Sequence, residues 1–336
     1  MPITIYWGRG FLHVLRSSIV CGSLTRRTGA VIFSSAKVKA RILLEAKHHR
    51  TRRQLNAQAS ARQSSVDAPA EAQSCEPSLK PPLKWAGGKR WLLPHLAPLW
   101  RPHQNRFYVE PFCGGLAAPL GLRPETALLN DLNPHLVNFY KHLQRGLEVT
   151  IEMKNEEECF YRHRNRFNQL IKDGKRETTE AAQLFYYLNR TCFNGLCRFN
   201  QSGEFNVPFG THKAITYATD FSQFRRVVKN WVFTSRDIES IEVKPEDFVY
   251  ADPPYDVEFT SYSAGGFSWE DQVRTAKWLA AHRGPVVLSN QATTRIVELY
   301  ETHGFEITYL DGPRRISCTG DRSAAKEVLA VKGLTG

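Results

Sequence analysis

A short strand that stops at two prolines constrains this chain more than any other feature. Residues 248–251 (Phe-Val-Tyr-Ala) form an apolar, aromatic run typical of a buried strand, and Asp252, Pro253, Pro254 and Tyr255 follow it directly. Proline cannot donate to a sheet ladder, so the pair predicts a turn at the strand's carboxyl end. Ligands bind at that edge of open α/β sheets. A carboxylate, free backbone carbonyls and an aromatic ring are therefore expected at one site.

Runs of strand length alternate with helical segments over residues 81–336. The expected strands are 107–110, 127–129, 231–235, 248–251, 285–289, 305–310 and 326–331, and the expected helices are 91–96, 133–143, 152–171, 178–188, 269–282 and 293–300. This alternation predicts an α/β fold with a Rossmann-like, doubly wound, mostly parallel sheet and helices on both faces. We expect one domain formed by residues 81–145 and 231–336, interrupted by an insert over residues 146–230.

A glycine turn follows the first of these strands. Gly114 and Gly115 come after Phe112, and Asp131 ends the next strand, seventeen residues past Gly114. Glycines let the backbone approach a ligand, and a carboxylate at this spacing can accept hydrogen bonds from ribose hydroxyls. The Gly-x-Gly-x-x-Gly pattern of pyrophosphate sites is missing. The turn therefore favours a nucleoside cofactor without phosphates, of which S-adenosylmethionine is the common one.

Two further stretches allow more than one interpretation. Trp85 and Lys89 flank a glycine pair and could meet a ligand, although a core tryptophan and a solvated lysine are favoured from these residues alone. Residues 189–210 interleave Asn and Gly with Arg and Phe in loop and hairpin patterns. Asn and Arg can read base edges and Arg can clamp phosphates, but turn-capping asparagines explain the pattern equally well.

The net charge of +12 belongs mostly to the N-terminus. Residues 1–66 hold twelve Lys and Arg and one acid, Glu45, which leaves the rest of the chain close to neutral. Three interpretations of residues 1–80 compete: a disordered extension, a transit-type presequence, and a basic arm that adds non-specific DNA affinity. We expect this segment to lie outside the fold, with the disordered extension favoured.

Several classes of protein are disfavoured. No apolar run reaches the ~18 residues that a membrane span needs. The seven cysteines are scattered without a Cys-x-x-Cys pair, which favours a reducing compartment and no structural zinc. No Pro-Cys pair is present, which argues against covalent cytosine-C5 methylation and against a zinc deaminase. We expect a cytoplasmic monomer without a metal or a membrane partner.

The loop at 252–255 suits chemistry on an aromatic amine. The amine of adenine is a poor nucleophile because its lone pair is delocalised into the ring. Acceptors on its hydrogens favour the change towards tetrahedral geometry, and Asp252 and the carbonyl of Pro253 could supply them. Tyr255 would stack on a base taken out of the duplex. Methyl transfer then needs positioning and electrostatics rather than a covalent intermediate. Asp252 as a plain turn-former and Tyr255 as a rim aromatic remain the structural alternatives.

Residues 83–332 resemble the Dam-type DNA adenine-N6 methyltransferases of the D12 class. The resemblance rests on several motifs in the family's order: Lys-Trp-Ala-Gly-Gly-Lys at 84–89, Val-Glu-Pro-Phe-x-Gly at 109–114, Asn-Asp-x-Asn at 130–133, Leu-Asn-Arg at 188–190, Asn-Gly-Leu-Cys-Arg-Phe-Asn at 194–200, Gly-Glu-Phe-Asn-Val-Pro-Phe-Gly at 203–210 and Asp-Pro-Pro-Tyr at 252–255. It implies a class I methyltransferase fold, S-adenosylmethionine as cofactor and double-stranded DNA as substrate, often at GATC.

The resemblance also implies roles for individual residues. The cofactor site would comprise Trp85, Lys89, Phe112, Gly114, Asp131 and Asp252, and the catalytic residues would be Asp252, Pro253 and Tyr255. The hairpin that reads DNA would contain Asn194, Leu196, Arg198 and Pro208. The resemblance therefore favours the ligand-binding interpretation of Trp85 and Lys89.

The chain departs from the family pattern at two places. Gly114-Gly115-Leu116-Ala117 stands where Gly-Ala-Gly-Ser is common, which could reshape the methionine end of the cofactor pocket, and His212 stands where an aromatic residue is frequent. Two other functions stay open: methylation of another planar amine (cytosine N4, RNA or a protein amide), and a DNA-binding relative that has lost catalysis.

Overall fold

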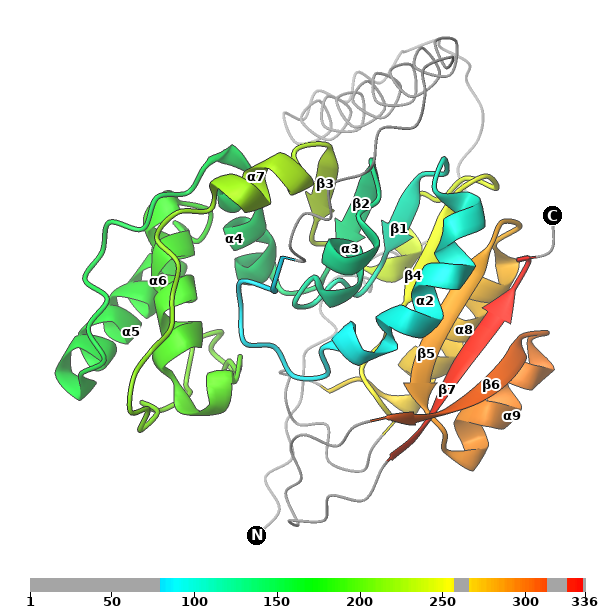
Figure 1. Cartoon of the computed structure of the whole chain (residues 1–336). Coiled ribbons are helices and arrows are strands. Elements are labelled where there is room, and N and C mark those ends of the chain that lie inside the picture. The colour runs from blue at the N-terminus through cyan, green and yellow to red at the C-terminus, as the bar shows by residue number, and fades with distance from the viewer. Residues whose placement is uncertain (1–78, 257–265, 313–324, 335–336) are drawn as a thin grey trace, which may run out of the picture. The chain divides into compact units, whose positions relative to one another are not determined.

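The computed structural model describes residues 79–256, 266–312 and 325–334, which belong to one compact unit. The extension predicted for residues 1–80 lies outside the described residues except for its last two positions. Figure 1 shows a central sheet flanked by helices. The strands are β1 (Tyr108–Glu110), β2 (Ala127–Asn130), β3 (Trp231–Thr234), β4 (Phe248–Ala251), β5 (Val286–Gln291), β6 (Glu306–Gly312) and β7 (Ala325–Lys332).

The seven strands form one sheet in the order β3-β2-β1-β4-β5-β7-β6. The first five are parallel, and β7 pairs antiparallel with both β5 and β6. The order reverses at β1, since β2 lies on one side of it and β4 on the other. Ligands bind at such a switch point in open α/β sheets. The predicted mostly parallel, doubly wound sheet is therefore confirmed.

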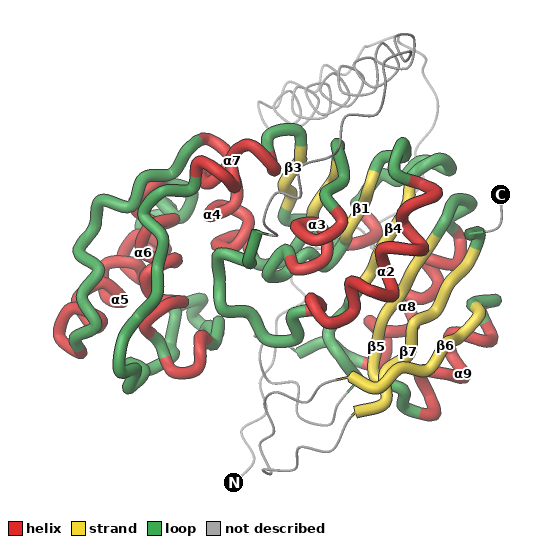
Figure 2. The backbone as a smooth tube through the Cα atoms, in the orientation of Figure 1, coloured by secondary structure: helices red, strands yellow, loops and turns green. Residues whose placement is uncertain are grey.

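Helices cover both faces of the sheet, as Figure 2 also shows. Phe248 and Tyr250 of β4 point to one apolar cluster, whereas Val249 and Ala251 point to a second, as the two-residue period of a strand requires. Helices α2 (Leu93–Trp100), α3 (Ala117–Leu122) and α4 (Pro134–Arg145) pack in the first cluster, and α8 (Trp269–Ala281) and α9 (Thr294–Thr302) pack in the second.

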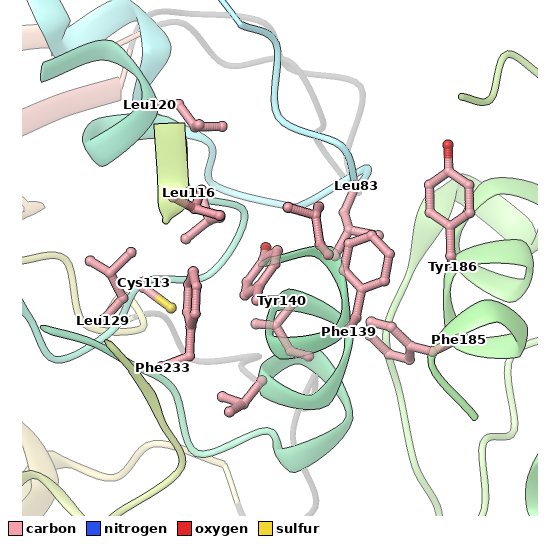
Figure 3. Packing of buried hydrophobic residues seen from close by; sticks show 14 of the residues in the cluster. Leu83, Cys113, Leu116, Leu120, Leu129, Phe139, Tyr140, Phe185, Tyr186 and Phe233 are labelled. Atoms are coloured by element: carbon pink, nitrogen blue, oxygen red, sulfur yellow. The ribbon is translucent and has the colours of Figure 1, made fainter. Parts of the chain in front are cut away.

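Between α4 and β3 the chain leaves the sheet for α5 (Glu157–Lys172), α6 (Thr179–Thr191) and α7 (Ser222–Val228). Helix α4 joins this region to the sheet, because it packs on both α6 and β3. Figure 3 shows Tyr140 of α4 near Phe233 of β3, and Phe139 near Tyr186 of α6. The assignment of residues 146–230 to a separate DNA-binding domain stays a prediction.

Three helices differ by three or more residues from their predicted bounds. Helix α2 ends at Trp100 rather than at 96. Helix α5 begins at Glu157 rather than 152, because the backbone at its N-cap, Glu156, is extended (φ −127°, ψ 140°). Helix α6 continues to Thr191, so Asn189 is helical rather than part of a loop. The hairpin predicted beyond it consists of two isolated bridges, Cys192 with Phe209 and Phe199 with Phe205.

Candidate active site

The predicted site residues gather at the carboxyl ends of three neighbouring strands. Asp131 follows β2, Gly114 lies four residues past β1, and Asp252 follows β4. These strands are adjacent and parallel in the sheet, so their carboxyl ends lie along one edge. The topology thus places the glycine turn between the two carboxylates.

The glycine turn is held by Asp131. Its Oδ2 accepts a hydrogen bond from the Gly114 amide at 3.1 Å, and its Oδ1 accepts one from the Asn133 amide at 2.9 Å. Burial raises the pKa of Asp131 from 3.8 to about 6, although these two backbone donors pull it down. Each carboxylate oxygen can accept a second hydrogen bond. The predicted role as acceptor for ribose hydroxyls is therefore compatible with this geometry.

Trp85 lies directly on the glycine turn. A Cβ atom at Gly114 would stand 2.7 Å from the indole Nε1 of Trp85, and one at Gly115 would stand 2.7 Å from the Trp85 Cβ. Both glycines are needed here for close approach, because any larger residue would displace the indole. From α4, the hydroxyl of Tyr140 donates to the Gly114 carbonyl at 2.6 Å. The turn is thus held by contacts from three separate segments.

Leu116 adopts a backbone conformation that leucine rarely takes. Its φ is +63°, in the left-handed region, at the position where the family commonly has glycine. This conformation costs roughly 1–2 kcal/mol for a residue with a Cβ. The Leu116 side chain is fully buried in the first apolar cluster (Figure 3), which offsets that cost. The departure noted in the sequence therefore places a fully buried side chain under the turn.

Asp252 forms a buried ion pair with Lys89. The Lys89 Nζ lies 3.0 Å from Oδ1 of Asp252, with side chains 5% and 17% exposed respectively. Ser289 of β5 donates to the same Oδ1 at 2.8 Å, and the Ser289 and Tyr250 hydroxyls are 3.0 Å apart. Burial raises the pKa of Asp252, while Lys89 and Ser289 lower it. Among the described residues, none donates to Oδ2, so one oxygen can still accept a hydrogen bond.

Tyr255 is restrained at both its ring and its hydroxyl. The Lys89 Nζ lies 4.4 Å from the ring centroid, within the range of a cation–π contact. The hydroxyl donates to Oε2 of Glu327 on β7. Gln272 of α8 donates to the Pro254 carbonyl at 2.7 Å, whereas no described group donates to the Pro253 carbonyl. The predicted acceptors, Asp252 Oδ2 and the Pro253 carbonyl, are thus both open within the described structure.

Residues 193–210, here called the recognition segment, contain the four residues predicted to bind DNA. Asn194, Arg198 and Pro208 are exposed, and Leu196 is half-buried against the first apolar cluster. The Arg198 Nε donates to the Asn206 side chain at 2.9 Å. Within the described residues, none of these four residues hydrogen-bonds to residues 252–255, the loop predicted to be catalytic and here called the catalytic loop.

Two connections join the region of the recognition segment to the motifs that are predicted to bind the cofactor. The side-chain oxygen of Asn189 accepts a hydrogen bond from the Lys84 backbone N–H at 2.8 Å. Its side-chain nitrogen donates to the Lys84 carbonyl at 2.8 Å and to the Gly195 carbonyl at 3.3 Å. The side-chain nitrogen of Asn133 lies 3.2 Å from the Cys197 sulfur. His212, which stands where an aromatic residue is frequent in the family, is half-buried, with its ring Nε2 3.0 Å from the Cys192 carbonyl.

Several residues in the site were not predicted from the sequence. Glu327 carried a signal, because it is the single acid in an apolar strand run at 327–331. By contrast, Phe112 was predicted as a cofactor-binding residue, and it is half-buried and packs edge-on against Phe267. Leu132, directly after Asp131, is 62% exposed beside the turn. Ser289 and Gln272 carried no sequence signal, because their roles depend on contacts between distant segments.

Two negative findings hold for the described part of the chain. It contains no cluster of three or more His, Cys, Asp or Glu side chains that could hold a metal ion. It also contains no helix long and apolar enough to cross a membrane.

Comparison with known proteins points to one family. The sequence model of the D12 class N6 adenine-specific DNA methyltransferases matches residues 85–316. The chain is 36% identical over 267 residues to the DNA N-6-adenine-methyltransferase of Escherichia phage P1, covering 74% of this chain but only 35% of that longer protein. It is 34% identical over 267 residues to the retron Ec67 DNA adenine methylase of Escherichia coli, covering 75% of this chain and 90% of the relative.

A solved structure of a putative RNA methyltransferase from Pyrococcus horikoshii also aligns with the chain. The alignment covers 83% of this chain and 96% of that one, at 10% identity and a TM-score of 0.35. A similarity this low adds nothing to the fold described above.

Proposed function

Because the chain belongs to the D12 class of N6 adenine-specific DNA methyltransferases, we propose that it transfers a methyl group from S-adenosylmethionine to the N6 amine of an adenine in duplex DNA. The observation that carries the proposal is the pair of open acceptors at the end of β4. Asp252 keeps Oδ2 free of described donors although Lys89 and Ser289 fix its other oxygen. The Pro253 carbonyl is one residue away.

The glycine turn and the flanking carboxylates suit S-adenosylmethionine. Asp131 retains acceptor capacity for ribose hydroxyls. Gly114 has no side chain, so its backbone lies close to the indole of Trp85. Asp131 and Asp252 bring carboxylates to the two sides of the turn, which favours a ligand that carries a sulfonium and an ammonium group. Burial raises the pKa of Glu110 well above its ordinary value, so this third acid adds less charge. The cofactor, when bound, supplies an electrophilic methyl group. Trp85, Lys89, Phe112, Gly114, Asp131 and Asp252 are the residues proposed to hold it.

Asp252 and Pro253 are proposed to prepare the amine for attack. A carboxylate oxygen and a backbone carbonyl that accept the two amine hydrogens draw the nitrogen towards tetrahedral geometry and free its lone pair. Asp252 must be ionised for this role, and Lys89 supports ionisation because it opposes the rise in pKa that burial causes. Lys89 thereby acts on the reaction through Asp252.

Tyr255 and the recognition segment are proposed to bind the DNA. An adenine flipped out of the duplex would stack on the Tyr255 ring, whose other face contacts Lys89. The exposed Asn194 and Arg198 can donate to base edges in the major groove, with Leu196 and Pro208 in contact beside them. The target sequence GATC rests on the family resemblance alone.

Product analysis tests the proposal. Purified protein, labelled S-adenosylmethionine and unmethylated duplex DNA are incubated, the DNA is digested to nucleosides, and the labelled nucleoside is identified. We expect N6-methyldeoxyadenosine. Label in N4-methyldeoxycytidine, or no label in DNA, would contradict the proposal. Sequencing of the methylated positions in the product then tests the GATC target separately. Methylation of adenine at another sequence would support the proposed reaction and contradict GATC as the target.

A further inference from the structure

The carboxylate of Glu327 reaches the catalytic loop from a distant strand. Glu327 lies on β7, opposite Gln291 of β5 and Leu310 of β6, and it is only 8% exposed. Its Oε2 accepts the hydrogen bond of the Tyr255 hydroxyl, seventy-two positions away in the chain. A buried carboxylate is costly unless its charge is satisfied, so its presence here calls for a role.

The neighbouring strand leaves space for this carboxylate. A Cβ atom at Gly312 of β6 would stand 2.5 Å from Oε1 of Glu327 and 2.8 Å from its Cδ. Gly312 does not have a positive φ, so its backbone conformation does not require glycine. Glycine at position 312 therefore serves to leave space for the Glu327 carboxylate.

Within the described structure, two contacts restrain the Tyr255 side chain. Lys89 covers one face at 4.4 Å, but Lys89 is also the partner of Asp252. The hydrogen bond to Glu327 is the contact that ties the far end of the Tyr255 ring to the sheet. Without it, Lys89 would be the one remaining described contact that restrains the ring. A flat base needs a ring of fixed orientation if its amine is to reach Asp252, because small misplacements lower rates sharply.

We propose that Glu327 is a positioning residue for the target base, acting through the Tyr255 hydroxyl to hold the ring on which the adenine stacks. This inference rests on the proposed function. Glu327 would make no contact with the base or the cofactor. Its loss should therefore lower the rate of methyl transfer and leave cofactor affinity unchanged.

A double-mutant cycle tests the proposal. Glu327→Ala, Tyr255→Phe, the double variant, and Glu327→Gln are compared with the parent for kcat, KM for DNA and Kd for S-adenosylmethionine. Removing one hydrogen bond that orients a reacting group should lower kcat about tenfold in each single variant. The double variant should be no slower than Tyr255→Phe, since both changes remove the same contact. Glu327→Gln keeps an acceptor and should retain most of the activity.

Two further variants sharpen the test. Gly312→Ala pushes the Glu327 carboxylate aside without changing either partner, and should lower kcat with cofactor affinity intact. Glu306→Ala removes an exposed acid on β6 and serves as the matched control, with no change expected. Losses that add in the double variant, or a Glu327→Ala protein that is less stable but turns over normally, would overturn the proposal. A parent that methylates no adenine overturns the proposed function as well.

Discussion

The carboxyl edge of the sheet around Asp252, here called the catalytic edge, and the recognition segment differ in how exposed and how well paired their polar side chains are. At the edge, Lys89 and Asp252 are almost buried and satisfy each other, with Ser289 completing the set. In the recognition segment, Asn194 and Arg198 are exposed, and Arg198 contacts only its own segment within the described structure. One region holds its polar groups in place before any ligand arrives, and the other leaves them available to a partner.

This contrast reflects how each region would use its charges. Charges that assist a reaction act strongly where water is excluded and need no reorganisation, which favours a buried and fixed arrangement. Groups that read DNA must exchange water for base edges and phosphates on binding, so exposure is required. Substitutions at the edge should therefore affect turnover, and substitutions in the recognition segment should affect which DNA is bound.

Asp252 gives the largest expected effect. Asp252→Asn keeps the size of the side chain but replaces an acceptor oxygen with an N–H₂ donor and leaves Lys89 without its counter-charge. We expect kcat to fall by about 10²–10³-fold, as for the loss of one preorganised electrostatic group. Affinity for DNA should change little, because the recognition segment is untouched. Labelled-methyl transfer and a filter-binding assay measure the two quantities. Near-parental turnover would remove Asp252 from the mechanism.

Asp131 should make cofactor binding depend on pH. With a pKa of about 6, its carboxylate is protonated as the pH falls through that value and loses acceptor capacity. Affinity for S-adenosylmethionine, measured by calorimetry from pH 5 to 8, should fall about tenfold on the acid side. Asp131→Asn should bind weakly at every pH and lose this dependence. A pH profile shared by parent and variant would assign the titration to another group.

The same pKa has a consequence for stability. The folded-state pKa of Asp131 lies above its ordinary 3.8, so the fold disfavours the ionised form. Its contribution to the free energy of unfolding is thus fully present below pH 3.8 and is lost as the pH rises through about 6. The site keeps a destabilising carboxylate, which is consistent with a binding role.

Arg198 gives a smaller and different effect. Arg198→Ala should lower discrimination between duplexes with intact and substituted target sites by about 1–3 kcal/mol, the range of one bidentate base contact. Cofactor affinity should stay at the parental value. Arg226→Ala, which removes an exposed arginine on α7, is the matched control. Equal losses of DNA affinity in both variants, with discrimination kept, would mean that Arg198 contributes only charge.

His135 gives the smallest expected effect, at the contact between α4 and the recognition segment. Its ring, on α4, stacks on Phe199 of the recognition segment at 4.8 Å, and its buried Nδ1 has no described hydrogen-bond partner. Burial and then Arg176 lower its pKa from 6.5 to about 4. The neutral imidazole therefore contributes stability that is present above pH 6.5 and is lost as the pH falls through about 4.

Urea unfolding at two pH values checks this. Between pH 7 and 5.5 the parent should lose about 1 kcal/mol of unfolding free energy through His135. His135→Phe keeps the aromatic stack and removes the titrating group. Between pH 7 and 5.5 its unfolding free energy should therefore fall by about 1 kcal/mol less than that of the parent. An identical loss in both proteins would place the acid sensitivity elsewhere.

The strands and the order of the motifs followed from the sequence alone. Residues 248–251 predicted β4 because four apolar residues end abruptly at two prolines, and both the period and the stop are local properties. The spacing of Gly114 and Asp131 likewise predicted a turn and an acid that the structure joins by a hydrogen bond. The hairpin was predicted less well, because the extent of α6 depends on packing rather than on propensity.

The tertiary structure alone decided which side chains complete the site. Ser289 and Glu327 reach the catalytic loop from strands thirty-seven and seventy-two positions away. Nothing in their local sequence specifies that distance. It also decided that Leu116 holds a left-handed turn, since only the surrounding core offsets that strain. Local patterns determine elements and candidate residues, whereas contacts between distant segments determine which polar groups are paired and which stay open for chemistry.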